Sequence, residues 1–578
     1  MHKDKQQTDW LTKGLFYLLI AFIIWFLVTF LIYPNLVVLK DVFWVDGQLS
    51  LKAVEKIMKS KRAIQSIKNS FLLAVTLTVT VNIVGIFIVM VSEYYEVKGA
   101  RLLRVAFMST LVFSGLVLNS GYLYVYGQNG ILTHLLVKVF PNLPLDWFQG
   151  YPAVLFVMTF ACTSFHMLFL RNAVKGLDNN VIEAAQNLGS GQWEILTKII
   201  LPSLKPVLLT LIIMTFQTGL GAMAAPLMVG GKDFQTISPL ILTFAQRPSS
   251  RDIAALLSLI LGAAQILLLV VMTINEKRGN YLSISKTKTA VQRQKIQNPV
   301  ANVLVHIVSY ILFFIYMTPL VLVVLFSFMN TRGIATSTLS WEYFTLENYT
   351  RILTDVASYK PLMTSLVFSG IAAVLSVLFM LVIARLVMRY KDNPWIQGME
   401  FLFYIPWLLP ALLIAIGLIL AYSVPSPLLL GQSVVGSLWP LPVAYMIMML
   451  PSTLRYIKGA YYSFDNNLED ASRILGASPL RTFVKVILPA LMPTALALVA
   501  LNFNQYLADY DLSAFLYQPN FPTLGVVIRS NADPSAHVDA QAINLVYSVI
   551  LIVLSTVILY LVYGRGSALS ERRSGLGQ

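Results

Sequence analysis

The chain has 578 residues, of which 57% are hydrophobic and only 12% are charged, and its mean hydropathy is +0.71. Soluble globular proteins carry about twice that charged fraction, so the composition excludes a soluble enzyme or a soluble binding domain. The formal net charge of +15 would suggest nucleic acid as a partner in a soluble protein, but Lys and Arg gathered in cytoplasmic loops explain it better in a membrane protein.

Apolar stretches long enough to cross about 30 Å of hydrocarbon as helices recur along the chain. We expect six of them in the first half, at 14–34, 70–91, 104–126, 152–170, 204–229 and 253–274. Six more are expected in the second half, at 303–328, 364–388, 400–422, 433–454, 490–510 and 543–563. Pro34 and Pro319 are expected to end the first span of each half. The fold class is therefore predicted as an all-α polytopic membrane protein with about twelve transmembrane helices in two tandem six-helix units.

Basic residues predict the topology and the domain boundaries. The stretch at 275–302 carries six Lys or Arg residues against one acid, Glu276, which indicates a cytoplasmic connector. It separates a first unit at 1–274 from a second unit at 303–578, and both chain termini are expected to be cytoplasmic. The segment at 35–69 should then be external, although it is also basic. Its cations include Lys52, Lys56, Lys59, Lys61, Arg62 and Lys68.

One polar stretch occurs twice, at 178–206 and again at 465–493, with a shift of 287 residues. Half the chain length separates the copies, so the chain is predicted to contain two homologous units in tandem. The shift superimposes Asp178 on Asp465, Asn180 on Asn467, Glu183 on Asp470, Gly189 on Gly476, Lys198 on Lys485, Pro202 on Pro489 and Pro206 on Pro493. Both copies are predicted to lie on the cytoplasmic side, so the two halves should run parallel.

Each copy has the pattern of a helix–turn–helix. Asn180 and Asn467 are each followed three residues later by an acid, which is the spacing of a capping box at a helix start. Gly189 and Gly476 follow one short helix later, where a residue tolerant of positive φ can end it. We expect the product to lie along the membrane surface with its acidic helix start exposed.

The pattern Glu-Ala-Ala, three residues, Gly, and a hydrophobic helix ending in Leu-Pro resembles the coupling motif of binding-protein-dependent ABC importer permeases. The first copy matches this motif at Glu183, Ala184, Ala185, Gly189, Leu201, Pro202 and Pro206. The second matches at Asp470, Ala471, Gly476, Ala477, Leu488, Pro489 and Pro493, with Asp in place of Glu and Ser472 in place of the second Ala. The sequence at 344–349, FTLENY, extends the resemblance, and the fusion of two halves is similar to ferric-iron, thiamine and some phosphonate permeases.

The resemblance implies that each short helix docks into an ATPase subunit. The implied partners are two copies of a cytoplasmic ABC ATPase and an extracellular or periplasmic substrate-binding protein, with the chain in a bacterial cell membrane. The sequence contains no Gly-x-x-x-x-Gly-Lys-Ser/Thr phosphate loop. Its five scattered histidines and single cysteine, Cys162, have no ligand spacing. We expect no catalytic residue, metal or cofactor in this chain, with ATP and Mg bound by the ATPase, and no nucleic acid as a partner.

The helices that follow the repeated stretches carry polar residues at membrane depth. Asn502, Gln505 and Asp509 share one helical face, and Gln217 lies in the corresponding helix of the first half. A charge at mid-membrane costs ~2.5–3.5 kcal/mol or more, so such groups normally face protein or water. We expect all four residues to line the substrate pathway, with interhelical hydrogen bonding as the alternative. The acidic pair of Asp509 and Asp511 favours a cationic substrate.

These observations predict the membrane permease of an ATP-driven importer. Ferric iron is the expected substrate because of the fused architecture, with thiamine, an organophosphonate or a polyamine as alternatives. The alternative class is an ion-coupled secondary transporter, which is also built from two repeats. Such transporters typically carry broken helices and charged groups at mid-membrane, whereas the repeated signal of this chain lies in its loops.

Overall fold

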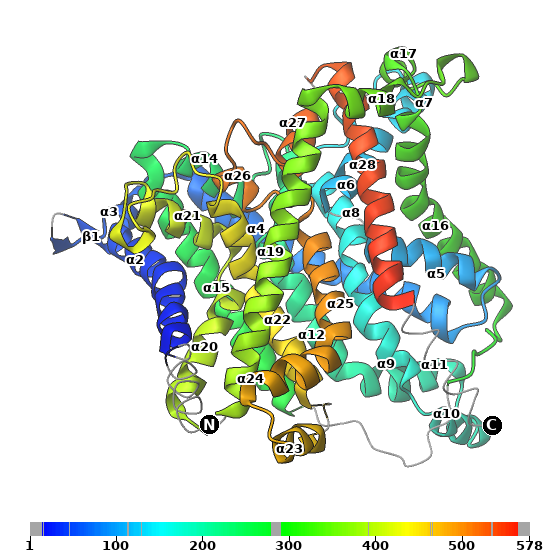
Figure 1. Ribbon diagram of the computed structural model, residues 1–578. Helices are drawn as coiled ribbons and strands as arrows, with labels where there is room; N and C mark the ends of the chain where they lie inside the picture. Colours follow the sequence, from blue (N-terminus) through cyan, green and yellow to red (C-terminus); the bar gives the residue numbers. More distant parts are fainter. Residues whose placement is uncertain are drawn as a thin grey trace.

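Helices build almost all of the structure, which is a computed structural model (Figure 1). It describes residues 14, 17–45, 47–111, 115–128, 130–278, 291–390, 392–462, 464, 466–532 and 536–564. The only sheet in these residues is the antiparallel hairpin of β1 (Trp44–Val45) and β2 (Gln48–Leu49). The predicted all-α class is confirmed.

Nine helices among the described residues are long and apolar enough to cross a membrane, and one bent pair would make a tenth. The nine are Tyr17–Phe43, Lys61–Tyr94, Tyr151–Lys175, Gln192–Leu220, Arg251–Leu268, Pro299–Ser327, Val356–Arg389, Pro479–Tyr506 and Val538–Val562. They agree with nine of the expected spans, so the protein is polytopic. The expected count of twelve is not reached in the part of the chain that is described.

Two of the three remaining expected spans are each divided into two shorter helices. The stretch expected at 104–126 forms two short helices, α5 (Ala100–Met108) and α6 (Gly115–Tyr126). Its counterpart at 400–422 forms α20 (Pro394–Leu408) and α21 (Ala411–Tyr422), bent by 106°. Pro410 lies in that second break and has no N–H to continue a helix. The third, α22 (Pro440–Tyr462), is 23 residues long, but its prolines and two cations lower its hydropathy.

The prediction that Pro34 and Pro319 end the first spans is wrong. Pro34 occupies the first turn of α2 (Tyr33–Phe43), where a missing N–H is tolerated. The wider π-helical turn η1 (Leu27–Ile32) comes directly before it, and the spanning helix continues to Phe43. Pro319 lies inside α16 (Pro299–Ser327), which also continues past it.

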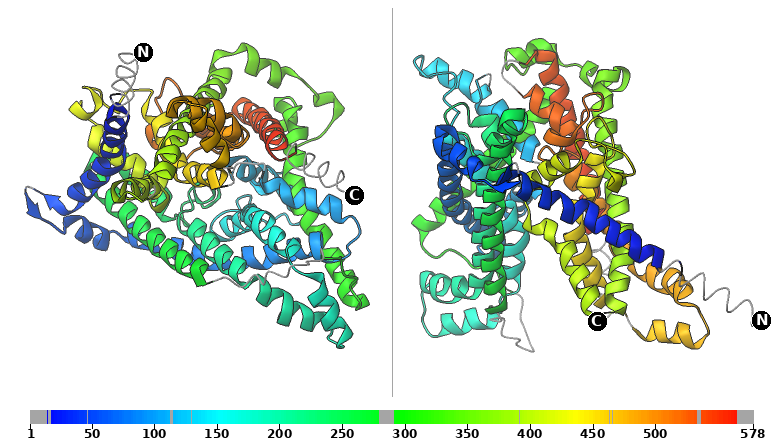
Figure 2. Two further views of the ribbon diagram at one scale, coloured as in Figure 1. Left: turned by 60° about the horizontal axis from the view of Figure 1, so that its bottom comes forward. Right: turned by 90° about the vertical axis from the view of Figure 1, so that its left-hand side faces the viewer.

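The first helix of each half packs against the other half. η1 and α2 contact α20 and α21 of the second half, whereas α16 contacts α5 and α6 of the first half. The core around Leu27 and Phe30 is accordingly built mostly from second-half residues, and the core around Tyr316 mostly from first-half residues. The right-hand view of Figure 2 follows the N-terminal helix, in dark blue, as it crosses from one group of helices to the other. The two halves therefore interlock.

A long helix packs against one or two others at the centre of each half. In the first half, α4 (Lys61–Val89) packs against α12 (Leu201–Leu220). In the second half, α19 (Val356–Arg389) packs against α22 and α25 (Leu488–Tyr506). Figure 1 shows α10 (Asn179–Asn187) and α23 (Asn466–Ile474), the starts of the repeated stretches, at the same end of the bundle. This arrangement supports parallel halves.

Candidate functional site

The first repeated stretch begins with a capped helix. The Asp178 side chain, not that of Asn180, caps α10, because its Oδ1 accepts the backbone N–H of Asn180 at 3.1 Å. The capping box predicted from Asn180 is therefore wrong for this copy. Glu183 instead accepts a hydrogen bond from Nδ2 of Asn179 at 2.6 Å. In the second copy, Asp465 lies outside the described residues.

Gly189 and Gly476 end α10 and α23 in the same way. Their φ angles are 86° and 78°, in the left-handed region that favours glycine. The residue after each glycine donates its N–H to the carbonyl five positions earlier, at 3.0 Å and 3.1 Å, which is the closing bond of a Schellman motif. A Cβ at either position would meet no described residue within 4 Å, so the backbone angle is what favours glycine here. This confirms the turn that the repeat predicts.

Matching apolar side chains are exposed on the two repeated stretches. Leu188 is 87% exposed and its counterpart under the repeat, Leu475, is 86% exposed. Trp193 and its counterpart Leu480 are 74% and 59% exposed. Around them, Glu183, Ala184, Asp470 and Ala471 are also exposed, whereas Ala185 is buried. Large apolar side chains are thus exposed at duplicated positions, at the end of the first helix of each repeated stretch and at the start of the spanning helix that follows it.

The end of the connector, residues 291–297, is bonded to the first repeated stretch. Three of the hydrogen bonds are Gln292 N–H to Asn179 Oδ1 (3.1 Å), Gln186 Nε2–H to Gln294 Oε1 (2.9 Å) and Gln297 N–H to Gln192 Oε1 (3.0 Å). Gln294 also donates its backbone N–H to the Tyr94 carbonyl at 2.8 Å, at the end of a spanning helix. We call residues 291–297 the strap. It ties α10 to the helix that leads into the second half.

In the second copy, a salt bridge fixes α23, where the first copy has the strap. Both oxygens of Glu469 accept hydrogen bonds from Arg385 of α19, at 2.8 Å and 2.6 Å. Because these bonds favour the ionised carboxylate, the pKa of Glu469 is lowered from its usual value. The counterpart of Glu469 in the first copy is Ile182, which is buried. Sequence reasoning missed this contact, and the departure from an apolar residue at that position was the available signal.

A cavity of about 340 Å³ lies between the two halves. It is lined by Gln217, Gly221, Leu261, Gln265, Pro406, Trp407, Leu409, Pro410, Ala411, Leu412, Met448, Pro451, Ser452, Gln505, Tyr506 and Asp511. Of the four residues predicted to line the pathway, Gln217 and Gln505 are in this wall, one from each half. The break between α20 and α21 supplies much of the rest.

Asn502 and Asp509, the other two residues predicted to line the pathway, are not in the lining of this cavity. Asn502 is 4% exposed, and its Nδ2 donates to Thr453 Oγ1 at 2.9 Å and to Ser376 Oγ at 3.3 Å. Its counterpart Thr215 is likewise buried and accepts a hydrogen bond from Nδ2 of Asn82 at 3.3 Å. These residues pack helices together, which was the alternative for the polar stripe.

The two acids after α25 have different surroundings. One oxygen of Asp509 accepts hydrogen bonds from the backbone N–H of Leu512 (3.2 Å), from the backbone N–H of Ser513 (3.0 Å) and from its hydroxyl (3.1 Å). Asp509 therefore holds a turn. Asp511 instead lines the cavity, and burial together with the charge of Asp509 raises its pKa above the usual value. Asp511 is the acid of the pair that a molecule in the cavity would meet.

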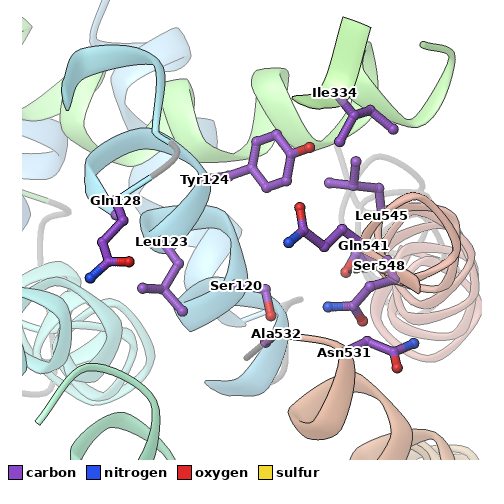
Figure 3. A pocket seen from close by; sticks show the side chains of 12 residues that line it. Ser120, Leu123, Tyr124, Gln128, Ile334, Asn531, Ala532, Gln541, Leu545 and Ser548 are labelled. Carbon is purple, nitrogen blue, oxygen red and sulfur yellow. Dashed lines mark hydrogen bonds between the residues drawn. The ribbon is translucent and has the colours of Figure 1, made fainter. Parts of the chain in front are cut away.

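A smaller cavity of about 80 Å³ lies where α6 of the first half meets α28 (Val538–Leu559) of the second (Figure 3). Ser120 and Tyr124 face it from α6, with Gln541 opposite on α28. Within the described chain, the hydroxyls of Ser120 and Tyr124 and Oδ1 of Asn544 have no hydrogen-bond partner. The lining has no charged residue, so this seam between the halves suits small neutral molecules such as water.

Comparison with known proteins links these features to transport. Residues 102–278 and 380–574 match the family described as binding-protein-dependent transport system inner membrane component. A probable ABC transporter permease protein of Sinorhizobium fredii is 37% identical over 552 residues, 95% of this chain and 96% of that one. A ferric transport system permease protein of Actinobacillus pleuropneumoniae is 21% identical over 538 residues, 92% of this chain and 75% of that one. A spermidine/putrescine transport system permease protein of Escherichia coli is 26% identical over 246 residues, 42% of this chain and 88% of that one.

Proposed function

The chain belongs to the family of binding-protein-dependent transport system inner membrane components, and on this premise we propose that it supplies both membrane halves of one ATP-driven importer. The family matches twice, once in each half, and the halves interlock through their first helices. One copy of the chain then suffices for the membrane domain, with its halves related by a pseudo-two-fold axis along the membrane normal.

Two surfaces of the repeated stretches are the proposed docking sites for two copies of a cytoplasmic ATPase. The observation that carries this proposal is the pair of matching exposed apolar positions, Leu188 with Leu475 and Trp193 with Leu480, beside turns of the same geometry. Such side chains would be buried by a partner subunit. Glu183, Ala184, Ala185 and Gly189, with Asp470, Ala471 and Gly476, are the proposed coupling residues. ATP and Mg would be bound by the ATPase, and this chain would be no enzyme.

The cavity between the halves is the proposed substrate pathway. It opens among Gln217 of α12, Gln505 of α25 and the carboxylate of Asp511. Both α12 and α25 continue directly from the docking stretches, so a movement of the ATPases would reach the cavity wall through them. An extracellular or periplasmic binding protein would deliver the substrate from the opposite side of a bacterial inner membrane.

Ferric iron is the substrate that we propose. The support is the ferric transport permease, which aligns over both halves, whereas the spermidine/putrescine permease aligns over less than half of this chain. The acidic Asp511 in the cavity suits a cationic cargo. Among the described residues, no three His, Cys, Asp or Glu side chains are grouped to hold a metal ion, so iron would pass as cargo. Thiamine, an organophosphonate and a polyamine are the alternatives.

Uptake into proteoliposomes tests the function. The full chain would be reconstituted with the ATPase and binding protein of its own genome, and uptake of labelled ferric iron, thiamine, 2-aminoethylphosphonate and spermidine compared. We expect iron uptake that requires both internal ATP and the binding protein. If a different compound were taken up under the same requirements, the proposed substrate would be wrong but the assignment to ATP-driven importers would stand. Uptake driven by an ion gradient without ATP would contradict the importer and favour a secondary transporter.

A further inference from the structure

The basic segment that follows the N-terminal helix has no role in the transport proposal. Between residues 52 and 62 it carries five cations and one acid, Glu55. It follows the first span, on the side of the membrane that is expected to be external. An excess of cations is unusual on that side. The structure folds it into the hairpin of β1 and β2, the short helix α3 (Lys52–Lys59) and the start of α4.

One face of α3 is fixed to the protein. Ala53 and Ile57 are buried, and Lys56 Nζ lies 2.6 Å from Oδ2 of Asp252 on α15 (Arg251–Arg278). These contacts leave α3 only one free face. Figure 1 shows the hairpin next to α2 and α3 at the periphery of the bundle, where it projects sideways. The free face and the hairpin are therefore directed away from the helices of both halves.

The free face combines apolar and basic side chains. The exposed apolar residues of the hairpin and of α3 with its N-cap are Trp44 (53%), Leu49 (69%), Leu51 (58%) and Met58 (68%). Lys52, Lys59 and Lys61 are exposed among them, and no salt bridge to these three lysines is found in the described part of the chain. The acid in the first turn of α3, Glu55, does not balance them. The surface thus offers a hydrophobic patch with three lysines against one acid, a net positive charge.

The length of the first helix places this surface at the edge of the bilayer. Tyr17–Phe43 is 27 residues long, which corresponds to about 40 Å at 1.5 Å per residue. The hydrocarbon core is about 30 Å thick, so a helix of this length can reach the headgroup region even when it is tilted. Trp side chains are enriched at that depth, and Lys can extend its ammonium group to the headgroups while its stem stays in apolar surroundings.

We propose that the hairpin and α3 form a binding surface for anionic phospholipid headgroups in the outer leaflet. Lys52, Lys59 and Lys61 contact the headgroup phosphates, and Trp44, Leu49 and Met58 enter the boundary between headgroups and acyl chains. Amphipathic segments with this composition bind such interfaces through buried apolar area and attraction to anionic lipid. An acidic face of a binding protein is the other conceivable partner. The sideways projection and the apolar patch favour lipid.

Lipid selectivity of the full-length protein in nanodiscs tests the proposal. The chain would be reconstituted in phosphatidylcholine with one-fifth phosphatidylglycerol, and the lipid retained after mild extraction quantified by mass spectrometry. We expect retained phosphatidylglycerol to be enriched, and the enrichment to fall about fivefold or more in the K52Q/K59Q/K61Q variant. The K52R/K59R/K61R variant preserves the charges and should keep the enrichment. Equal retention in the wild type and the Gln variant would overturn the proposal.

A depth measurement separates lipid from a protein partner. A nitroxide on Met58→Cys, in a chain whose own Cys162 is buried, should report headgroup depth from its relative accessibility to oxygen and to a water-soluble relaxant. A fully aqueous label would contradict the proposal. So would a Gln variant that keeps its lipid selectivity but binds the substrate-binding protein less tightly in phosphatidylcholine alone, because the surface would then be a protein-docking site. Neither measurement depends on ATP or on transport.

Discussion

Pro34 in the first helix lies against Gly417 of α21, where a Cβ added to the glycine would sit 3.3 Å from the Cβ of the proline. The same crossing occurs with the halves exchanged: a Cβ on Gly121 of α6 would sit 3.1 Å from the Cβ of Pro319. Each contact joins a first helix to the broken helix pair of the other half. The two halves are therefore joined twice by the same kind of contact, in which a proline of one first helix packs against a glycine of the other half.

The first prediction concerns this interlock. Gly417→Val and Gly121→Val should each destabilise the protein by about 1–3 kcal/mol, because the added side chain has no room beside the proline. Thermal unfolding of the detergent-solubilised chain measures the effect. Gly459→Val is the control, since a Cβ at this position of α22 meets none of the described residues within 4 Å. Equal melting temperatures for all three variants would contradict the close crossing.

The second prediction concerns the turns of the repeated stretches. The G189V/G476V double variant places a β-branched residue at positive φ twice, at a cost of about 1–3 kcal/mol each. We expect ATP hydrolysis stimulated by the binding protein to fall strongly while the membrane domain stays folded, because neither side chain meets a neighbour. Gly191→Val is the matched control, since its φ is −71° and its surroundings are equally open. Normal coupling in the double variant would refute the proposed role.

The third prediction concerns the exposed apolar pair. L188S/L475S should weaken co-purification of the ATPase about tenfold or more, because apolar side chains buried in the centre of an interface contribute most of its free energy. Leu353→Ser is the control, because Leu353 is 80% exposed on α18 (Glu347–Thr354), far from the repeated stretches. An unchanged yield of complex in the double variant would mean that the ATPase binds elsewhere.

The fourth prediction separates the two acids beside the cavity. Burial and the charge of Asp509 raise the pKa of Asp511 above its usual value, so its carboxyl is neutral below that raised pKa and charged above it. Uptake of a cation that needs this charge should rise as the pH increases through the raised pKa. Asp511→Asn should be slow and should lose this rise without a change in melting temperature.

Asp509→Ala should behave differently. It removes the acceptor of three hydrogen bonds and should destabilise the protein by about 1–3 kcal/mol. The rise of the residual uptake should move to lower pH, because the charge of Asp509 no longer raises the pKa of Asp511. A pH-independent wild type, or an Asp511→Asn variant with normal uptake, would remove Asp511 from the pathway.

Local sequence was sufficient where a residue's own backbone decides the structure. The turns at Gly189 and Gly476 were predictable because positive φ is a property of the residue and its neighbours. The lining of the cavity could not be predicted in this way. The helical period places Asn502 and Gln505 on the same face of α25 but does not say which of them another helix covers. Only the packing of α19 and α22 against α25 decides which of them is covered. The continuation of the first helix past Pro34 was also beyond local rules, because it depends on the π-helical turn before the proline.

The strap makes the two repeated stretches inequivalent, because among the described residues it contacts α10 and not α23. Residues 291–297 are held by α10 and lead directly into α16, which packs on α5 and α6 of the first half and on α28 of the second. A movement of α10 can therefore reach both halves through its hydrogen bonds to the strap and through α16, whereas the Arg385–Glu469 salt bridge joins α23 only to its own half. Two identical ATPase subunits would therefore act on the membrane domain through unequal connections. On the side of α10, the covalent link between the halves is itself part of the connection.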